Sequence, residues 1–227
     1  MNRWICSSVM CGVLAGAGAQ VPLRTLQFSQ DRNGAAAVAQ YTLVVAEDGA
    51  GVYVGKVVNG PVTISGQGGD GKAIHVDAAV VKKLFDAVPM VEGGRCETHS
   101  KGLAKMGLKT LRYLGAGREA QCAYNYSDDD RVNAATTTFE AVAETMQYGE
   151  RLQAKLRFDR LGLDAELDGL QSALDQGRAL AVGNIAPVLQ QISDDERVMD
   201  RVHRKAARLL QGVAAAQPGG PAVPSER

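Results

Sequence analysis

Residues 41–58 read YTLVVAEDGAGVYVGKVV, and this stretch decides how the fold begins. Its two ends, residues 41–46 and 52–58, are rich in the β-branched residues that favour strands. Between them, Glu47-Asp48-Gly49 contains an Asp-Gly pair, and both residue types tolerate the positive φ that tight turns require. The stretch therefore predicts a β-hairpin.

The sequence on both sides of this hairpin predicts further strands. A first strand is expected within residues 22–30, and residues 62–65 and 73–76 look like a strand pair joined by a glycine-rich loop. Later, residues 109–114 and 119–124 flank Gly115-Ala116-Gly117 and predict a second hairpin. An antiparallel sheet built from hairpins follows.

One helix is expected between the two hairpins. Asp77 is a suitable N-cap, and Pro89 is expected just past the end of the helix. The apolar residues between them fall on one helical face: Val80, Val81, Leu84, Phe85 and Val88.

A short set of motifs links these elements: Tyr41-x-Leu43-x-Val45-x-x-Asp48-Gly49, then Tyr53-x-Gly55, then Leu84-Phe85 and the later hairpin. Their order resembles a family of uncharacterised bacterial secreted α+β domains that begin with strand, Asp-Gly and strand. The similarity covers about residues 38–158, and residues 61–76 form an insertion relative to the family pattern. The resemblance implies a small α+β fold and carries no activity to this chain.

From about residue 131, helical periodicity replaces the strand pattern. A capping box at Thr137 and Glu140 predicts a helix that ends near Phe158, and a second box at Ser193 and Glu196 predicts the start of a last helix. Two helices are expected between them, one with leucines at 163, 167, 170 and 174, and a short one around residues 185–192. The fold class is therefore α+β, with an antiparallel sheet, one packed helix and a helical C-terminal segment. Whether that segment packs on the sheet stays open at this point.

The first residues predict export from the cytosol. Arg3 precedes a mostly apolar run, Trp4 to Leu14, and Ala17-Gly18-Ala19 forms a small-residue cleavage site. The run is shorter than the roughly 20 apolar residues of a spanning helix, which disfavours a membrane anchor. A lipid anchor on Cys11 is disfavoured because the residues before it lack the usual pattern. The expected organisation is a signal peptide (1–19), an α+β sheet domain (20–130), a helical region (131–212) and a disordered tail (213–227).

Signal cleavage would leave two cysteines, Cys96 and Cys122, in an oxidising compartment. They predict one disulfide, with two separate buried thiols as the alternative. A redox role is disfavoured because the chain between them is long and forms no C-x-x-C pair. The 25 basic and 25 acidic residues of the 227-residue chain give no excess that would favour nucleic acid, and no second apolar run suggests a membrane span.

Motifs that resemble ligand sites lack the required surroundings. Residues 66–72 match G-x-x-x-x-G-K, but Ala73 replaces the magnesium-binding hydroxyl and a strand pattern follows, so a hairpin loop is favoured. His75, His99 and His203 have no partner at metal spacing, and a disulfide would occupy Cys96 of Cys96-x-x-His99. His203 is expected on a solvated helix face among basic residues.

Two charged segments remain. Residues 127–130, SDDD, lack the spacing of a calcium loop and are interpreted as a charged loop and helix start. Residues 157–164 are interpreted as a salt-bridged junction between the sheet domain and the helical tail, with a contact surface as the alternative. We therefore predict no catalytic, cofactor-binding or metal-binding residue.

The leading hypothesis is a secreted or periplasmic, non-enzymatic interaction or binding module. Its C-terminal helices would contact another envelope or secreted protein, because exposed amphipathic faces need a partner. The alternative is an extracytoplasmic hydrolase whose site combines scattered carboxylates with Tyr53, Tyr113 or Tyr124. A structural envelope protein without a small ligand is a third possibility.

Overall fold

The computed structural model describes residues 23–31, 40–58, 60–62, 71–98, 107–115 and 117–216. The predicted signal peptide, His99 and residues 217–227 of the predicted tail lie outside these ranges.

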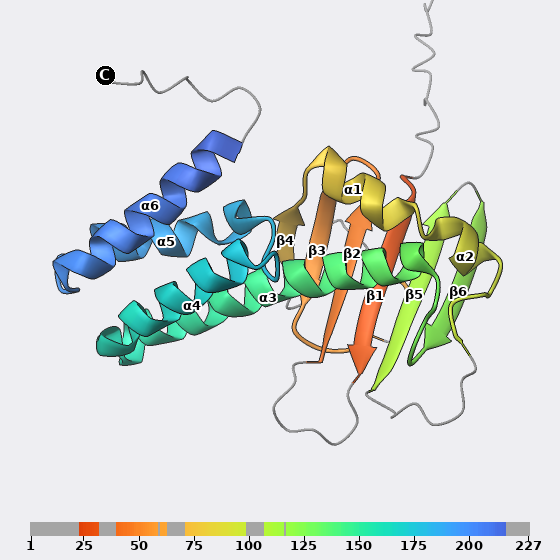
Figure 1. The fold of residues 1–227 in the computed structure, drawn as a ribbon, viewed down its shortest axis with the longest axis horizontal. Coiled ribbons are helices and arrows are strands. Elements are labelled where there is room, and N and C mark those ends of the chain that lie inside the picture. The colour runs from red at the N-terminus through yellow and green to blue at the C-terminus, as the bar shows by residue number, and fades with distance from the viewer. Residues whose placement is uncertain are drawn as a thin grey trace, which may run out of the picture.

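Six strands form one antiparallel sheet in the order β4-β3-β2-β1-β5-β6 (Figure 1). Both predicted hairpins are confirmed, as β2–β3 and β5–β6, and β1 lies between them. The strands are β1 (Thr25–Asp31), β2 (Tyr41–Ala46), β3 (Ala50–Val54), β4 (Lys72–His75), β5 (Leu108–Gly115) and β6 (Arg118–Tyr124).

The turn of the first hairpin depends on Gly49. Its φ is 87°, and its N–H donates to the carbonyl of Ala46 at 3.0 Å, as in a three-residue hairpin loop that ends in a left-handed residue. The side chain of Asp48 accepts a hydrogen bond from the N–H of Ala50 at 2.9 Å. A Cβ atom at position 49 would lie 2.3 Å from the carbonyl oxygen of Val76. Position 49 therefore requires glycine, because another residue would be strained at this φ and its Cβ atom would clash with the carbonyl of Val76.

The third strand is shorter than predicted because the chain turns over the sheet after Val54. On the face opposite the helices, the amide of Gln27 donates to the carbonyl of Gly60 and accepts from the N–H of Val62, both at 3.0 Å. The hydroxyl of Thr42 accepts from the N–H of Val58 at 3.0 Å. These bonds satisfy polar side chains that are almost completely buried.

The predicted strand partner of residues 73–76 is only partly described. The structure pairs β4 with β3, whereas residues 63–65 lie outside the described ranges.

The expected single packed helix is two helices, α1 (Ala78–Phe85) and α2 (Val88–Glu92). The carboxylate of Asp77 caps α1 as predicted, accepting from the N–H of Val80 at 2.8 Å. The expectation for Pro89 was wrong: it lies in the first turn of α2. Proline is tolerated there because the first N–H groups of a helix have no intrahelical partner.

Helix α3 (Asp130–Phe158) connects the sheet to the remaining helices. Its first part lies on the same face of the sheet as α1 and α2, and its second part extends past β4 (Figure 1). Beyond β4 it packs with η1 (Arg160–Gly162), α4 (Leu163–Asp175), η2 (Val182–Ile185) and α5 (Ala186–Asp194), and α6 (Asp200–Ala216) packs on α4 and α5. We call this group, with the second part of α3, the helical unit.

One hydrophobic core runs through both parts of the molecule. On the sheet side, the rings of Phe139 and Phe28 stack with their centroids 5.3 Å apart and their planes 7° apart. On the other side, Gly149 of α3 lets η2 approach closely, because a Cβ atom there would lie 2.5 Å from Ile185. The helical segment therefore packs on the sheet domain through α3.

Both predicted capping boxes were wrong. Helix α3 begins at Asp130, about two turns before Thr137, and the side chain of Asp129 caps it. Ser193 lies inside α5, and α6 begins only at Asp200. Four-residue motifs of this kind occur by chance within helices, and tertiary packing decides which one is used. Helix α6 reaches Ala216, four residues beyond the predicted end of the helical region.

Candidate interaction surface

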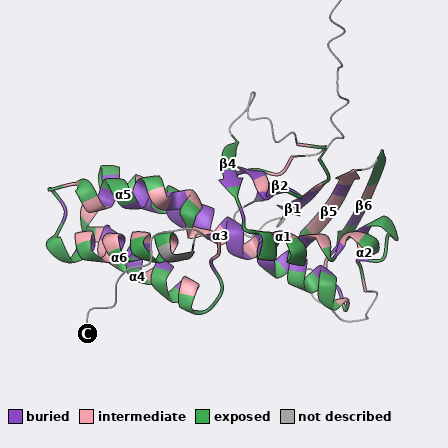
Figure 2. Cartoon of the chain, turned by 90° about the horizontal axis from the view of Figure 1, so that it is seen from above, coloured by how far each residue is buried: buried purple, intermediate pink, exposed green. Residues whose placement is uncertain are grey.

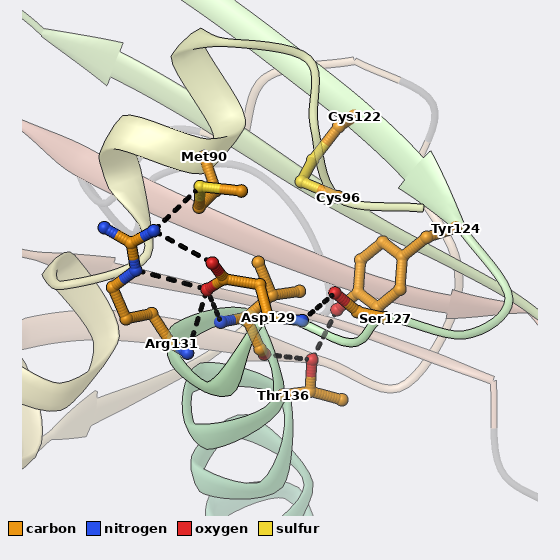
Figure 3. The surroundings of a disulfide bond; sticks show 9 residues. Met90, Cys96, Cys122, Tyr124, Ser127, Asp129, Arg131 and Thr136 are labelled. Atoms are coloured by element: carbon orange, nitrogen blue, oxygen red, sulfur yellow. Dashed lines mark hydrogen bonds and ion pairs between the residues drawn. A yellow bond between two sulfur atoms is a disulfide. The ribbon is translucent and has the colours of Figure 1, made fainter. Parts of the chain in front are cut away.

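The predicted disulfide between Cys96 and Cys122 is confirmed (Figure 3). Their Cα atoms lie 6.0 Å apart, and both residues are buried, with exposed fractions of 1% and 7%. The bridge attaches the segment after α2 to β6, and Thr98 continues the attachment by donating its N–H to the carbonyl of Tyr126 at 3.0 Å. Because the sulfur atoms are buried, the bridge is structural rather than a redox site.

The acidic run at 127–130 forms the start of α3, as predicted. The carboxylate of Asp129 accepts from the N–H groups of Arg131 and Val132 at 3.0 and 3.3 Å. It also binds the guanidinium of Arg131, which in turn contacts the sulfur of Met90 (Figure 3). The Arg131 side chain holds the pKa of Asp129 below its usual value. This carboxylate is fully engaged as a helix cap.

The three tyrosines named as alternatives for a hydrolase lie at separate places in the sheet. Tyr53 lies on β3 and Tyr113 on β5, with β2 and β1 between these strands. Tyr124 on β6 donates or accepts a hydrogen bond with the hydroxyl of Thr136, inside the core. Burial raises the pKa of Tyr53 to about 12 and raises that of Tyr124 further. The hydroxyls of Tyr53 and Tyr124 therefore stay protonated, and the two side chains contribute to packing.

The residues of the other ligand-like motifs are also separated or engaged. Lys72 lies in β4 and forms an ion pair with Glu150 of α3 at 2.9 Å, while residues 66–70 lie outside the described ranges. His203 was expected on a solvated face, but it is half-buried and its Nδ1 bonds the carbonyl of Ser193 at 2.7 Å. Across the described ranges, no group of three or more His, Cys, Asp or Glu residues could hold a metal ion.

The charged segment 157–164 lies at the end of the helical unit away from the sheet (Figure 1). The interpretation as a junction between sheet domain and tail was therefore wrong. Because α3 continues unbroken to Phe158, the segment joins α3 to α4 instead. An ion pair of 3.4 Å between Arg160 and Asp195 connects it to the turn between α5 and α6. We call these two turns, residues 157–162 and 195–199, the distal tip.

The distal tip carries the most exposed large apolar side chains of the described residues. Phe158 and Leu161 are 85% and 79% exposed, and Met199 on the second turn is 36% exposed. The other exposed large apolar residues, at 23, 108 and 126, are 46–50% exposed and lie away from the tip, at or near strand ends of the sheet. Two large apolar side chains that are this exposed within one short turn are a candidate contact surface.

Beside these residues lies an open depression with a volume of about 860 Å³. Two of the three carboxylates that line it are already bound, because Asp194 accepts the amide of Gln190 and Asp195 accepts two arginines. The bonds from Arg197 and the nearby Arg160 hold the pKa of Asp195 far below its usual value. The depression is lined by Leu156, Arg157, Arg160, Gln190, Gln191, Asp194, Asp195, Glu196 and Arg197. An open, ion-paired surface suits binding better than proton transfer.

The low pKa of Asp195 predicts how stability changes with pH. A carboxyl whose pKa is lower in the folded state stabilises the fold above its unfolded value, 3.8, and loses that contribution as the pH falls further. We expect Asp195→Asn to lower the free energy of unfolding at pH 7, and we expect the gap to wild type to close towards pH 2. Urea unfolding at both pH values measures the two gaps. If the difference in stability between wild type and Asp195→Asn were equal at pH 7 and pH 2, the charge of Asp195 would not stabilise the turn.

Comparison with known proteins does not assign this chain to a family. No family model matches the sequence, and no curated protein matches it either. Within the described ranges, no helix is both long enough and apolar enough to cross a bilayer.

Proposed function

We propose that this protein is a non-enzymatic binding module that works outside the cytosol, secreted or in a periplasm. It contacts another envelope or secreted protein through the distal tip. The observation that carries the proposal is the exposure of Phe158 and Leu161, 85% and 79%, on one short turn. Burying both side chains against a partner would remove apolar surface from water, which is the main driving force of protein association.

The sequence and the disulfide support the compartment. The bridge between Cys96 and Cys122 suits an oxidising space, since such bonds are rare in the cytosol. The N-terminal pattern ending in Ala17-Gly18-Ala19 suits export and cleavage. The resemblance of residues 38–158 to secreted bacterial domains agrees with this placement.

The charges of the distal tip indicate the chemistry of the partner. Arg157 has no ion-pair partner among the described residues, whereas Arg160 and Arg197 both bind Asp195. An incoming surface with an apolar pocket and a carboxylate at its rim would cover Phe158 and give Arg157 a partner. Arginine and aromatic residues are the residue types most often found at the energetic centre of interfaces.

Photo-cross-linking in the native host tests the proposal. A photoreactive phenylalanine analogue at position 158 is expected to form an adduct with one protein. The same analogue at Leu108, which is 49% exposed on the sheet, is expected to form none. The isolated adduct also gives the N-terminus of the chain, where Gln20 is expected after signal cleavage.

A double variant then measures the contribution of the two side chains. Phe158→Ser with Leu161→Ser is expected to weaken binding to the cross-linked protein by about tenfold or more, as loss of interface anchors does. Leu108→Ser is the matched control and should leave affinity unchanged. Both variants should unfold like wild type within about 0.5 kcal/mol, because the side chains are exposed. Equal cross-linking at both positions, or unchanged affinity of the double variant, would refute the proposal.

A further inference from the structure

The two edge strands of the sheet, β4 and β6, differ in the partners that the described residues offer to their outward backbone groups. Strand β4 is short, and the side chain of Asn184 from η2 binds the outer side of its backbone. The amide of Asn184 accepts from the N–H of His75 at 2.7 Å and donates to its carbonyl at 2.9 Å. One side chain thus imitates a neighbouring strand at His75 and occupies its outward backbone groups.

Strand β6, at the other edge, has open backbone groups. Gly115 pairs with Arg118 across a two-residue connection, so this pair exchanges hydrogen bonds. In an antiparallel pair, every second residue bonds the neighbouring strand, so Arg118, Ala120, Cys122 and Tyr124 bond β5. The N–H and C=O groups of Glu119, Gln121 and Ala123 therefore point away from β5. All three residues are exposed, and within the described ranges none has a backbone bond to a segment other than β5. Strand β6 stands at the edge of the sheet, away from the helical unit (Figure 2).

The centre of this edge also lacks the usual protection against strand pairing. Exposed edges commonly carry lysine, proline or a bulge. In β6 the charged residues, Arg118 and Glu119, stand only at the start, and the middle of the strand reads Ala120-Gln121-Cys122-Ala123. Small and neutral residues allow another backbone to approach.

We propose that β6 pairs with β6 of a second copy of this chain, antiparallel and with the two-fold axis at Gln121. This register pairs the whole strand: Arg118 faces Tyr124 of the other copy, Glu119 faces Ala123, and Gln121 faces itself. No like charges stand opposite each other. An axis at Glu119 would place two carboxylates face to face, which destabilises strand pairs.

The pairing joins two six-stranded sheets into one continuous sheet. It leaves the distal tip free, because the helical unit lies beyond β4, at the opposite edge (Figure 1). The dimer would present two tips at its two ends, and two linked contacts can raise overall affinity without any new interaction. The inference itself rests on the edge of the sheet and does not depend on the proposed contact at the tip.

Sedimentation velocity of the purified protein, in a concentration series up to about 1 mM, tests the pairing. Wild type is expected to shift towards twice the monomer mass. Gln121→Pro is expected to stay monomeric, because proline removes an outward N–H that β5 does not use. Gln121→Ala is the matched control: it loses the same side chain but keeps the N–H, and it should dimerise like wild type.

Amide hydrogen exchange of wild type gives a second readout that needs no variant. The amides of Glu119, Gln121 and Ala123 are expected to exchange more slowly at high protein concentration, while the amide of His75, which already donates to Asn184, does not change. A wild type that stays monomeric throughout the series, or a Gln121→Pro variant that is folded by circular dichroism and still dimerises, would overturn the inference.

Discussion

Phe139→Ala is expected to lower the free energy of unfolding by about 3–5 kcal/mol, the range for removing a buried aromatic ring. The ring is fully buried and stacks on Phe28 of β1, the strand that joins the two hairpins. It lies on the part of α3 that crosses the sheet. Its loss would leave a cavity between the sheet and the helix that organises the helical unit.

Phe158→Ala is the matched control, because it makes the same chemical change at the last residue of the same helix. Its side chain is 85% exposed, so its effect should stay within about 0.5 kcal/mol. Urea unfolding followed by circular dichroism measures both variants. The far-ultraviolet signal follows the helices and the near-ultraviolet signal follows the packed tyrosines, four in the sheet and Tyr148 in α3, and the two should change together because α3 belongs to both parts. Similar losses for the two variants would contradict the assignment of Phe139 to the core.

The hairpins could be predicted because their causes are local. Alternating β-branched residues around Glu47-Asp48-Gly49 determine both the strands and the turn, and the structure contains that hairpin. The order of the strands in the sheet could not be predicted from local sequence patterns. Strand β1 lies between the hairpins because Phe28 and Leu26 fill the centre of the core, and such distant contacts leave no local pattern.

The place of residues 157–164 could not be read from their charges. The sequence correctly predicts that the helix ends near Phe158, but it does not show that the first part of α3 lies on the sheet and the second part extends past β4 (Figure 1). Residues 157–164 therefore lie beyond the sheet rather than between the sheet and the helices. The exposure of Phe158 and Leu161 depends on this tertiary arrangement. The open edge at β6 likewise depends on which strands become neighbours.

Replacing Cys96 and Cys122 together by alanine is the second change with a large expected effect. We expect a loss of about 3–4 kcal/mol, because a bridge across a sequence separation of 26 restricts the unfolded chain. The bridge also holds the segment before Thr98 on β6, next to the cap of α3. Urea unfolding of wild type and of the double variant measures the difference.

Reduction of wild type provides the control for this change. The reductant should bring the stability of wild type close to that of the double variant and should leave the double variant unchanged, since only wild type has a bond to break. Residual differences between reduced wild type and the variant report the packing of the two buried side chains rather than the cross-link. If the reductant left wild type unaffected after full reduction of both thiols, the bridge would contribute no stability. The fold would then depend on its hydrophobic core alone.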